Sequence, residues 1–151
     1  MNLCDEPGEM LCLTLEQVEQ IRRQAAAKPN QEICGLLAGV GRSVARIYPV
    51  SNVAPYPASS YYMDPLEQLD ALSDIDEHGW DLLAAYHSHP CNGPGFPSPT
   101  DIALSSDSML LHLIVVIGGD GLLTSCRAFR IADDHVTEIA LQIADANGPQ
   151  T

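Results

Sequence analysis

The sequence predicts an α/β (α+β) domain, with one mixed β-sheet and about three helices in an α/β/α arrangement. Segments with helical periodicity and capping residues alternate with short apolar segments that are typical of strands. Residues 111–117 are almost all apolar, as expected for a strand in the middle of a sheet. The chain has 151 residues, which is enough to bury a core, and we expect a single domain over residues 1–151.

The N-terminal part is expected to begin with a short edge strand over residues 10–13. Thr14 and Gln17 have the spacing of a capping box, which predicts a helix that ends near residues 28–30. The apolar face of this helix is predicted to contain Leu15, Val18, Ile21 and Ala25. A buried strand over 32–39 and its hairpin partner over 43–50 follow.

Residues 51–62 are rich in Pro, Ser, Asn and Tyr, and we interpret them as an ordered loop. Asp64-Pro65 predicts the start of a second helix, because Asp is a good N-cap and proline is favoured at the first helical position. Gly79 is expected to end this helix. Its period is set by Leu66, Leu69, Leu72 (or Ser73) and Asp76. The next strand, from residue 80 to 86, delivers two histidines.

The rest of the chain is expected to contain one short helix and three strands. Ser98 and Pro99 follow a Gly- and Pro-rich loop and are interpreted as the cap and first residue of a helix that reaches about residue 106. Strands are predicted over 111–117, 122–131 and 136–143, with turns between them. The tail over about 145–151 is expected to be disordered.

Composition excludes several classes of partner. The formal charge of −13 repels phosphate backbones and anionic membranes, so we expect neither nucleic acid nor membrane as a partner. No apolar run has the length of a membrane span, and the N-terminus lacks the pattern of a signal peptide, which favours a cytoplasmic protein. An acidic surface with Lys28 as its only lysine also suits a high-salt host. The five cysteines have no C-x-x-C spacing, which argues against a zinc knuckle or a disulfide framework.

The residues that carry chemistry are concentrated between His87 and Asp101. Histidines at i and i+2 of a strand point to the same face, and His87 and His89 have this spacing. Together with Asp101 they form a set of three ligands that suits a catalytic zinc, which keeps its fourth position for water. Such a water needs a general base, and Glu32, at the start of an apolar strand, is the best candidate. Ser98 is a candidate donor to the oxyanion of the intermediate.

Each of these residues also has a structural interpretation. Ser98 is explained as a helix cap, and Asp101 as an acidic first-turn residue that complements the helix dipole. Glu32 alone would be read as a carboxylate at the edge of a strand. Ser88, between the two histidines, points to the opposite face, so packing or a backbone hydrogen bond is expected of it. Cys91 follows the motif directly and is a candidate for lining the site.

The pattern His-Ser-His-Pro, then Pro-Ser after six residues and Asp after two more, resembles the signature of the JAMM (MPN-plus) zinc metallopeptidases. The segments 31–39, 51–53 and 62–65 resemble that family as well, and the likeness covers about residues 10–140. The resemblance implies a cytidine-deaminase-like three-layer fold, one Zn²⁺ held by His87, His89 and Asp101, Glu32 as general acid/base, and Ser98 as oxyanion donor. The chain is similar in size to the compact stand-alone prokaryotic members.

This resemblance implies a zinc-dependent isopeptidase or peptidase that hydrolyses an amide bond at the C-terminal tail of a ubiquitin-like protein of the sulfur-carrier type. One alternative is a non-catalytic interaction module of the same fold, although the complete ligand set argues against it. A second alternative is a zinc-dependent deaminase of small molecules. That class requires His-x-Glu and Pro-Cys-x-x-Cys, and neither motif is present. The sequence leaves the carrier protein, the leaving group and the oligomeric state open.

Overall fold

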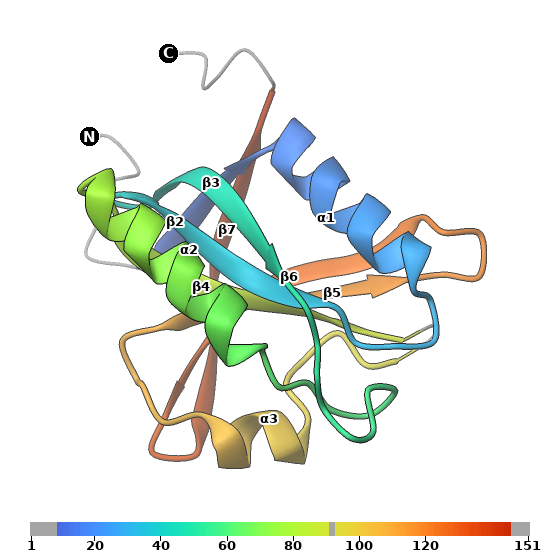
Figure 1. The fold of residues 1–151 in the computed structure, drawn as a ribbon. Helices are drawn as coiled ribbons and strands as arrows, with labels where there is room; N and C mark the ends of the chain where they lie inside the picture. The colour runs from blue at the N-terminus through green and yellow to red at the C-terminus, as the bar shows by residue number, and fades with distance from the viewer. Residues whose placement is uncertain (1–8, 91–92, 146–151) are drawn as a thin grey trace.

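The computed structural model describes residues 9–90 and 93–145, and its core is a mixed β-sheet (Figure 1). The helices are α1 (Leu15–Ala27), α2 (Pro65–Glu77) and α3 (Pro99–Leu104). The strands are β1 (Met10–Thr14), β2 (Cys34–Val40), β3 (Ser43–Val50), β4 (Asp81–His89), β5 (Leu111–Ile117), β6 (Leu123–Ala132) and β7 (His135–Ala144). The predicted elements are therefore all present, in the predicted order.

The sheet is curled and closes on itself through β1. Its strand order is β1-β3-β2-β4-β5-β6-β7, and β1 runs parallel to both β7 and β3. The prediction of an edge strand at residues 10–13 is therefore wrong. The alternation of Leu11 and Leu13 with half-buried neighbours suits a strand that is buried on one face and hydrogen-bonded along its length.

Two hydrophobic clusters lie on opposite faces of the sheet, as the three-layer prediction requires. On one face, Ile21 of α1 packs in a cluster with Leu37 and Tyr86. On the other face, Ala71 of α2 packs in a cluster with Leu36 and other strand residues. Consecutive residues of β2 thus belong to different cores, which is the period-two alternation of a strand covered on both faces. In Figure 1, α1 and α2 lie on different sides of the sheet.

The predicted helix starts are confirmed by their hydrogen bonds. At α1, the Thr14 hydroxyl accepts from the Gln17 N–H, and the Gln17 side chain accepts from the Thr14 N–H. At α2, the Asp64 carboxylate accepts from the first-turn N–H groups, with Pro65 at the first helical position. Gly79 follows α2 with a positive φ of 68°, as expected at a helix C-terminus.

The predicted apolar face of α2 is wrong. Ala71 and Ile75 face the sheet, whereas Leu66 and Leu69 are 74% and 62% exposed. Asp74, one turn from Ala71, accepts hydrogen bonds from Arg46 and from the Tyr48 hydroxyl, both on β3. The face of α2 that meets the sheet thus carries both apolar and polar residues. In α1, Leu15 is likewise exposed, but the other three predicted residues are buried.

The expectations for the C-terminal tail and for Cys91 concern residues that the structure does not describe. The expected disordered tail falls almost entirely on residues 146–151, and Cys91 is also outside the described residues. Within residues 9–90 and 93–145, none of the helices has the length and apolar character needed to cross a membrane.

Gly35 provides a test of the packing between β2 and its neighbours. A Cβ at this position would collide with the Tyr48 carbonyl oxygen and the Tyr86 ring. We expect Gly35→Ala to lower the free energy of unfolding by roughly 1–3 kcal/mol through overpacking. Gly41→Ala is the control: its φ of 64° is strained, but nothing lies within 4 Å of the new Cβ. Urea denaturation measures both variants against the wild type, and an unchanged free energy of unfolding in Gly35→Ala would contradict this packing.

Candidate metal centre

The candidate site lies at the C-terminal end of β4, on the face of the sheet that α2 covers. Cys34 of β2 is paired with His87 of β4, and paired residues project from the same face. Two residues further along β4, His89 projects the same way. The side chains of His87 and His89 are both buried, with residue exposures of 1% and 4%. The predicted presentation of two imidazoles by one strand is therefore confirmed.

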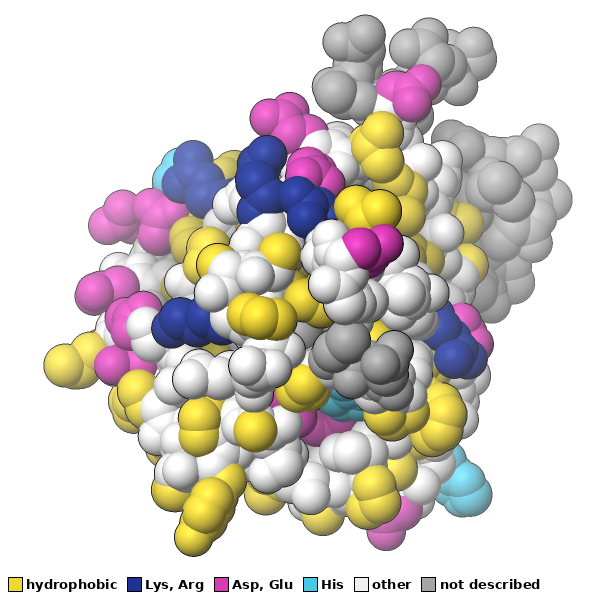
Figure 2. Space-filling model, turned by 90° about the vertical axis from the view of Figure 1, so that its right-hand side faces the viewer, with side chains coloured by type: hydrophobic (Ala, Val, Ile, Leu, Met, Phe, Trp, Pro, Cys, Tyr) yellow, Lys and Arg dark blue, Asp and Glu magenta, His cyan; other side chains and the backbone are white. Residues whose placement is uncertain are grey.

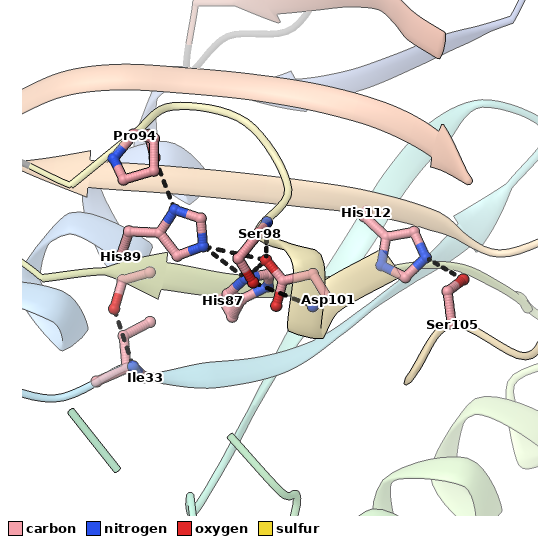
Figure 3. A network of polar contacts seen from close by, with 9 residues as sticks. Ile33, His87, His89, Pro94, Ser98, Asp101, Ser105 and His112 are labelled. Carbon is pink, nitrogen blue, oxygen red and sulfur yellow. Dashed lines mark hydrogen bonds and ion pairs between the residues drawn. The ribbon is translucent and has the colours of Figure 1, made fainter. Parts of the chain in front are cut away.

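Asp101 is brought to the histidines by the start of α3 (Figure 3). The Ser98 hydroxyl accepts from the Asp101 N–H at 3.0 Å, and Asp101 Oδ2 accepts from the Ser98 N–H at 2.8 Å, which together form a capping box. The same Oδ2 lies 3.1 Å from Nε2 of His87 and 3.1 Å from Nε2 of His89. The two Nε2 atoms are 3.2 Å apart. Three potential ligand atoms therefore meet at one point.

These distances fit a tetrahedral metal ion. Zinc bonds of about 2.0–2.1 Å with tetrahedral angles place neighbouring ligand atoms roughly 3.3 Å apart. Nδ1 of His89 lies 2.6 Å from the Pro94 carbonyl oxygen, which can only accept, so Nδ1 carries a proton, and in the neutral imidazole Nε2 is the nitrogen with the lone pair. A neutral His89 then faces the Asp101 carboxylate with two acceptors in contact, an arrangement that a cation stabilises.

Burial and the close contacts among the three groups shift the pKa of each of them. Burial by itself would raise the pKa of Asp101, but the contacts with His87 and His89 outweigh it and hold the pKa far below its usual range. Burial lowers the pKa of His87, which favours its neutral form. For His89, burial is outweighed by Asp101 and the Pro94 carbonyl, so the pKa is raised. A buried carboxylate beside a neutral imidazole is a ligand set for a divalent cation.

Glu32 lies beside this group, but it is not part of a strand. The prediction that it opens the strand 32–39 is wrong by two residues, since β2 begins at Cys34. Its side chain is buried, and Oε1 has no hydrogen-bond partner among the described residues. Burial, together with the negative charge of Asp101, raises the pKa of Glu32 to about 7. A buried carboxylate with a free oxygen and a pKa near neutrality has the properties of a general base.

The sequence reading missed two residues around the histidines. The Tyr61 ring stacks on His87, with 4.5 Å between centroids and 28° between planes. His112, on β5, is buried and lines a cleft that reaches Asp101. Its Nε2 lies 3.4 Å from the Ser105 hydroxyl (Figure 3). A signal for His112 was available, because an imidazole in a run of aliphatic residues needs a polar partner.

The cleft has a volume of about 450 Å³ and connects the metal centre with the space between α2 and α3. Its lining includes Tyr62, Pro65 and Gln68 on one side and Thr100 and Leu104 on the other. Figure 2 shows histidine and acidic side chains at the floor of a hollow in the surface. The cleft itself reaches the site at Asp101.

The comparison with known families agrees with this geometry. The family model of the prokaryotic homologues of the JAB domain matches residues 14–132, which include all five candidate site residues. This chain belongs to the prokaryotic JAB-domain family. The predicted likeness to the JAMM metallopeptidases, with their cytidine-deaminase-like fold, is thereby confirmed.

Relatives of this JAB-domain chain include two named peptidases. It is 38% identical over 136 residues to the "Probable TtuB-protein conjugate cleaving protease" of Thermus thermophilus, covering 90% of this chain and 84% of the relative. It is 41% identical over 106 residues to the desampylase of Haloferax volcanii, covering 69% and 74%. With the three metal ligands in place, the chain is a JAMM metallopeptidase.

Solved structures show the same fold. A protein from Desulfitobacterium hafniense, 34% identical, superimposes with a TM-score of 0.79 over 91% of this chain and 94% of its own. A JAB1/MPN domain protein from Archaeoglobus fulgidus superimposes with a TM-score of 0.59 over 91% of this chain and all of its own. At 18% identity, the second likeness concerns the fold alone.

Removal of a ligand tests the metal centre. After loading with zinc and dialysis, we expect about one zinc ion per chain in the wild type and near-complete loss in His87→Ala and Asp101→Ala, because two ligands do not hold the ion. His135→Ala, at the exposed start of β7, is the control and should keep its zinc. Elemental analysis by mass spectrometry gives the stoichiometry. Full occupancy in Asp101→Ala would remove this residue from the ligand set.

Proposed function

We propose that this metallopeptidase uses a single zinc ion to hydrolyse the amide bond that follows the C-terminal tail of a ubiquitin-like protein of the sulfur-carrier type. The observation that carries the proposal is the convergence of Nε2 of His87, Nε2 of His89 and Oδ2 of Asp101 within 3.2 Å, next to the free carboxylate oxygen of Glu32. The names of the two relatives support a protein conjugate as the substrate.

Zinc suits two imidazole nitrogens and one carboxylate oxygen better than the harder cations do. A zinc ion with an open fourth position lowers the pKa of a water molecule and polarises a carbonyl group. The protein supplies what surrounds that chemistry. The capping box fixes Oδ2 of Asp101, and the Pro94 carbonyl fixes the tautomer and ring orientation of His89.

Glu32 is the proposed general acid and base. Its buried Oε1 accepts a proton from the attacking water, and the resulting carboxylic acid donates that proton to the leaving amine nitrogen. A pKa raised to about 7 suits both steps, since proton transfer is most efficient when the pKa of the catalyst is near the working pH. Oε1, which has no hydrogen-bond partner within residues 9–90 and 93–145, is then the oxygen that meets the water.

Ser98 is the proposed donor to the developing oxyanion. Its hydroxyl oxygen accepts the Asp101 N–H, which leaves its own proton free to be donated. The helix-cap interpretation and the catalytic one are therefore compatible: capping uses a lone pair of the hydroxyl, and oxyanion stabilisation uses its hydrogen.

The partner surface is proposed to extend from the cleft onto α2. Pro65 and Gln68 line the cleft, and the exposed leucines Leu66, Leu69 and Leu72 lie on the same helix. The cleft accepts an extended tail, whereas an apolar stripe on a helix suits the folded body to which the tail belongs. The alternatives have less support. A non-catalytic module does not require a complete ligand set, and a deaminase requires motifs that this sequence lacks.

The role of Glu32 is tested with Glu32→Gln, which keeps the shape of the side chain but cannot accept a proton. We expect this variant to bind one zinc per chain and to cleave a TtuB–reporter protein conjugate at least 10²-fold more slowly than the wild type, as is typical for the loss of a general base. Single-turnover kinetics followed by gel electrophoresis measures the rate. Wild-type cleavage by Glu32→Gln would exclude Glu32 as the base.

The surface on α2 is tested with Leu69→Glu. We expect KM for the TtuB–reporter conjugate to rise about tenfold with little change in kcat, because a lost apolar contact at the centre of an interface costs more than about 1 kcal/mol. A short peptide with the same tail sequence should be cleaved as by the wild type. Leu15→Glu, at the exposed start of α1, is the matched control. Equal KM values for Leu69→Glu and the wild type would exclude this surface.

A further inference from the structure

The main chain around Glu32 is held in place by a side chain of the strand that carries the histidines. Ser88 lies between His87 and His89 on β4 and is 2% exposed. Its hydroxyl oxygen accepts a hydrogen bond from the Ile33 N–H at 2.9 Å, which is drawn at Ile33 in Figure 3. The same hydroxyl lies 3.4 Å from the Gln31 carbonyl oxygen, to which it donates. Ser88 is thus bonded to both residues that flank Glu32.

The register of β2 and β4 explains why a hydroxyl is needed at this place. Cys34 pairs with His87, so the next opposed pair is Ile33 with Ser88, followed by Glu32 with His89. In a regular antiparallel ladder, such a pair exchanges two bonds between N–H and C=O groups. Here the Ser88 N–H does donate to the Ile33 carbonyl at 2.9 Å, but the Ile33 N–H is bound by the Ser88 side chain.

The replacement of a main-chain acceptor by the Ser88 hydroxyl ends the ladder at Ile33, one residue before Glu32. Since the hydroxyl takes the place of the Ser88 carbonyl, the segment 31–33 leaves the regular strand geometry while its polar groups stay bonded, in agreement with the start of β2 at Cys34. By the same register, Glu32 and His89 come next in line, beyond the part of β2 and β4 that is paired as a ladder.

Other contacts to Glu32 come from the loop that follows β3. The Glu32 N–H donates to the Pro57 carbonyl at 2.7 Å, and the Asn52 side-chain amide donates to the Glu32 carbonyl at 2.8 Å. Neither contact involves β4. Ser88 is thus the residue whose side chain links the segment of Glu32 to the strand of His87 and His89.

We propose that Ser88 is a positioning residue, which sets the distance between the Glu32 carboxylate and the metal ligands by bonding the main chain on both sides of Glu32. This inference rests on the proposed function, in which Glu32 transfers protons to and from the reacting groups. Ser88 itself does not reach them, because it projects to the opposite face of β4. Its effect is exerted entirely through the position of Glu32.

The inference is tested by kinetics of Ser88→Ala, Ser88→Cys and Ser88→Thr in the zinc-loaded protein. Displacement of a catalytic group by about 1 Å can cost on the order of 10²-fold in rate. We expect kcat on the TtuB–reporter conjugate to fall about 10- to 100-fold in Ser88→Ala, with KM within about twofold of the wild type. Ser88→Cys keeps the volume of the side chain but replaces the oxygen by a weak acceptor, and should lose a similar factor. Ser88→Thr retains the hydroxyl and should restore kcat.

The matched control is Thr124→Val on β6, which removes a different hydroxyl that donates to a strand carbonyl, that of Val116 at 3.3 Å. This control should change the melting temperature but not kcat. If Ser88→Ala and Ser88→Cys retain the wild-type kcat, or if Thr124→Val loses as much, the positioning role is excluded. If Ser88→Ala does not fold, Ser88→Cys against Ser88→Thr decides.

A second measurement does not depend on catalysis. In the metal-free protein, the Ile33 amide hydrogen should exchange with solvent at least tenfold faster in Ser88→Ala and Ser88→Cys than in the wild type, while amides of β5 are unchanged. Equal exchange at Ile33 would show that Ser88 does not anchor this segment. If the wild type does not cleave the conjugate but the Ile33 amide still exchanges faster in the Ser88 variants, the proposed function is contradicted and the anchoring role of Ser88 stands. The two failures are therefore distinguishable.

Discussion

The antiparallel pairing of β2 with β4 is the constraint on which the site depends. Cys34 is opposite His87, and two residues further in the same register Glu32 comes opposite His89, on the same face. A shift of one residue in this register would turn Glu32 to the other face, away from both imidazoles. The hydrophobic residues enforce the register: Leu36 and Ala85 pack toward α2, whereas their neighbours pack toward α1. The two cores thereby specify the geometry of the catalytic groups.

The site also depends on the close approach of several hydrogen-bond acceptors at the metal centre. Three atoms with lone pairs approach one another within 3.2 Å in a buried place, and Glu32 adds a fourth acceptor nearby. Burial and the charge of Asp101 raise the pKa of Glu32, whereas the contacts with His87 and His89 outweigh burial and lower the pKa of Asp101. The fold holds these groups together through contacts outside the group itself: the capping box at Ser98, the carbonyl of Pro94 and the hydroxyl of Ser88.

Local signals in the sequence were sufficient for most of this description. Helix starts depend on residues such as Thr14 and Asp64 that bond within their own turn, and these were predicted correctly. The face of α2 was not, because the partners of Ala71 and Asp74 lie on strands that are distant in the sequence.

The metal ligands share one short motif and were recognisable from it. The pairing of β1 with β7, in contrast, joins segments that lie more than a hundred residues apart, and no local pattern encodes such a contact. The stacking of Tyr61 on His87 depends on the path of a loop. Glu32 was assigned to a strand because its neighbours are apolar, but a side-chain hydroxyl on another strand ends β2 before it. Contacts between distant segments therefore account for the differences.

The closure of the sheet has a consequence for the way the protein is made. β1 comes first in the chain, yet most of its ladder is formed with β7, at residues 140–144. During synthesis, β1 can therefore complete its ladder only after residues 140–144 have left the ribosome. Such long-range pairing slows folding and leaves an unpaired strand exposed in the meantime. A nascent chain that already contains all three metal ligands thus still lacks β7, the strand with which β1 pairs.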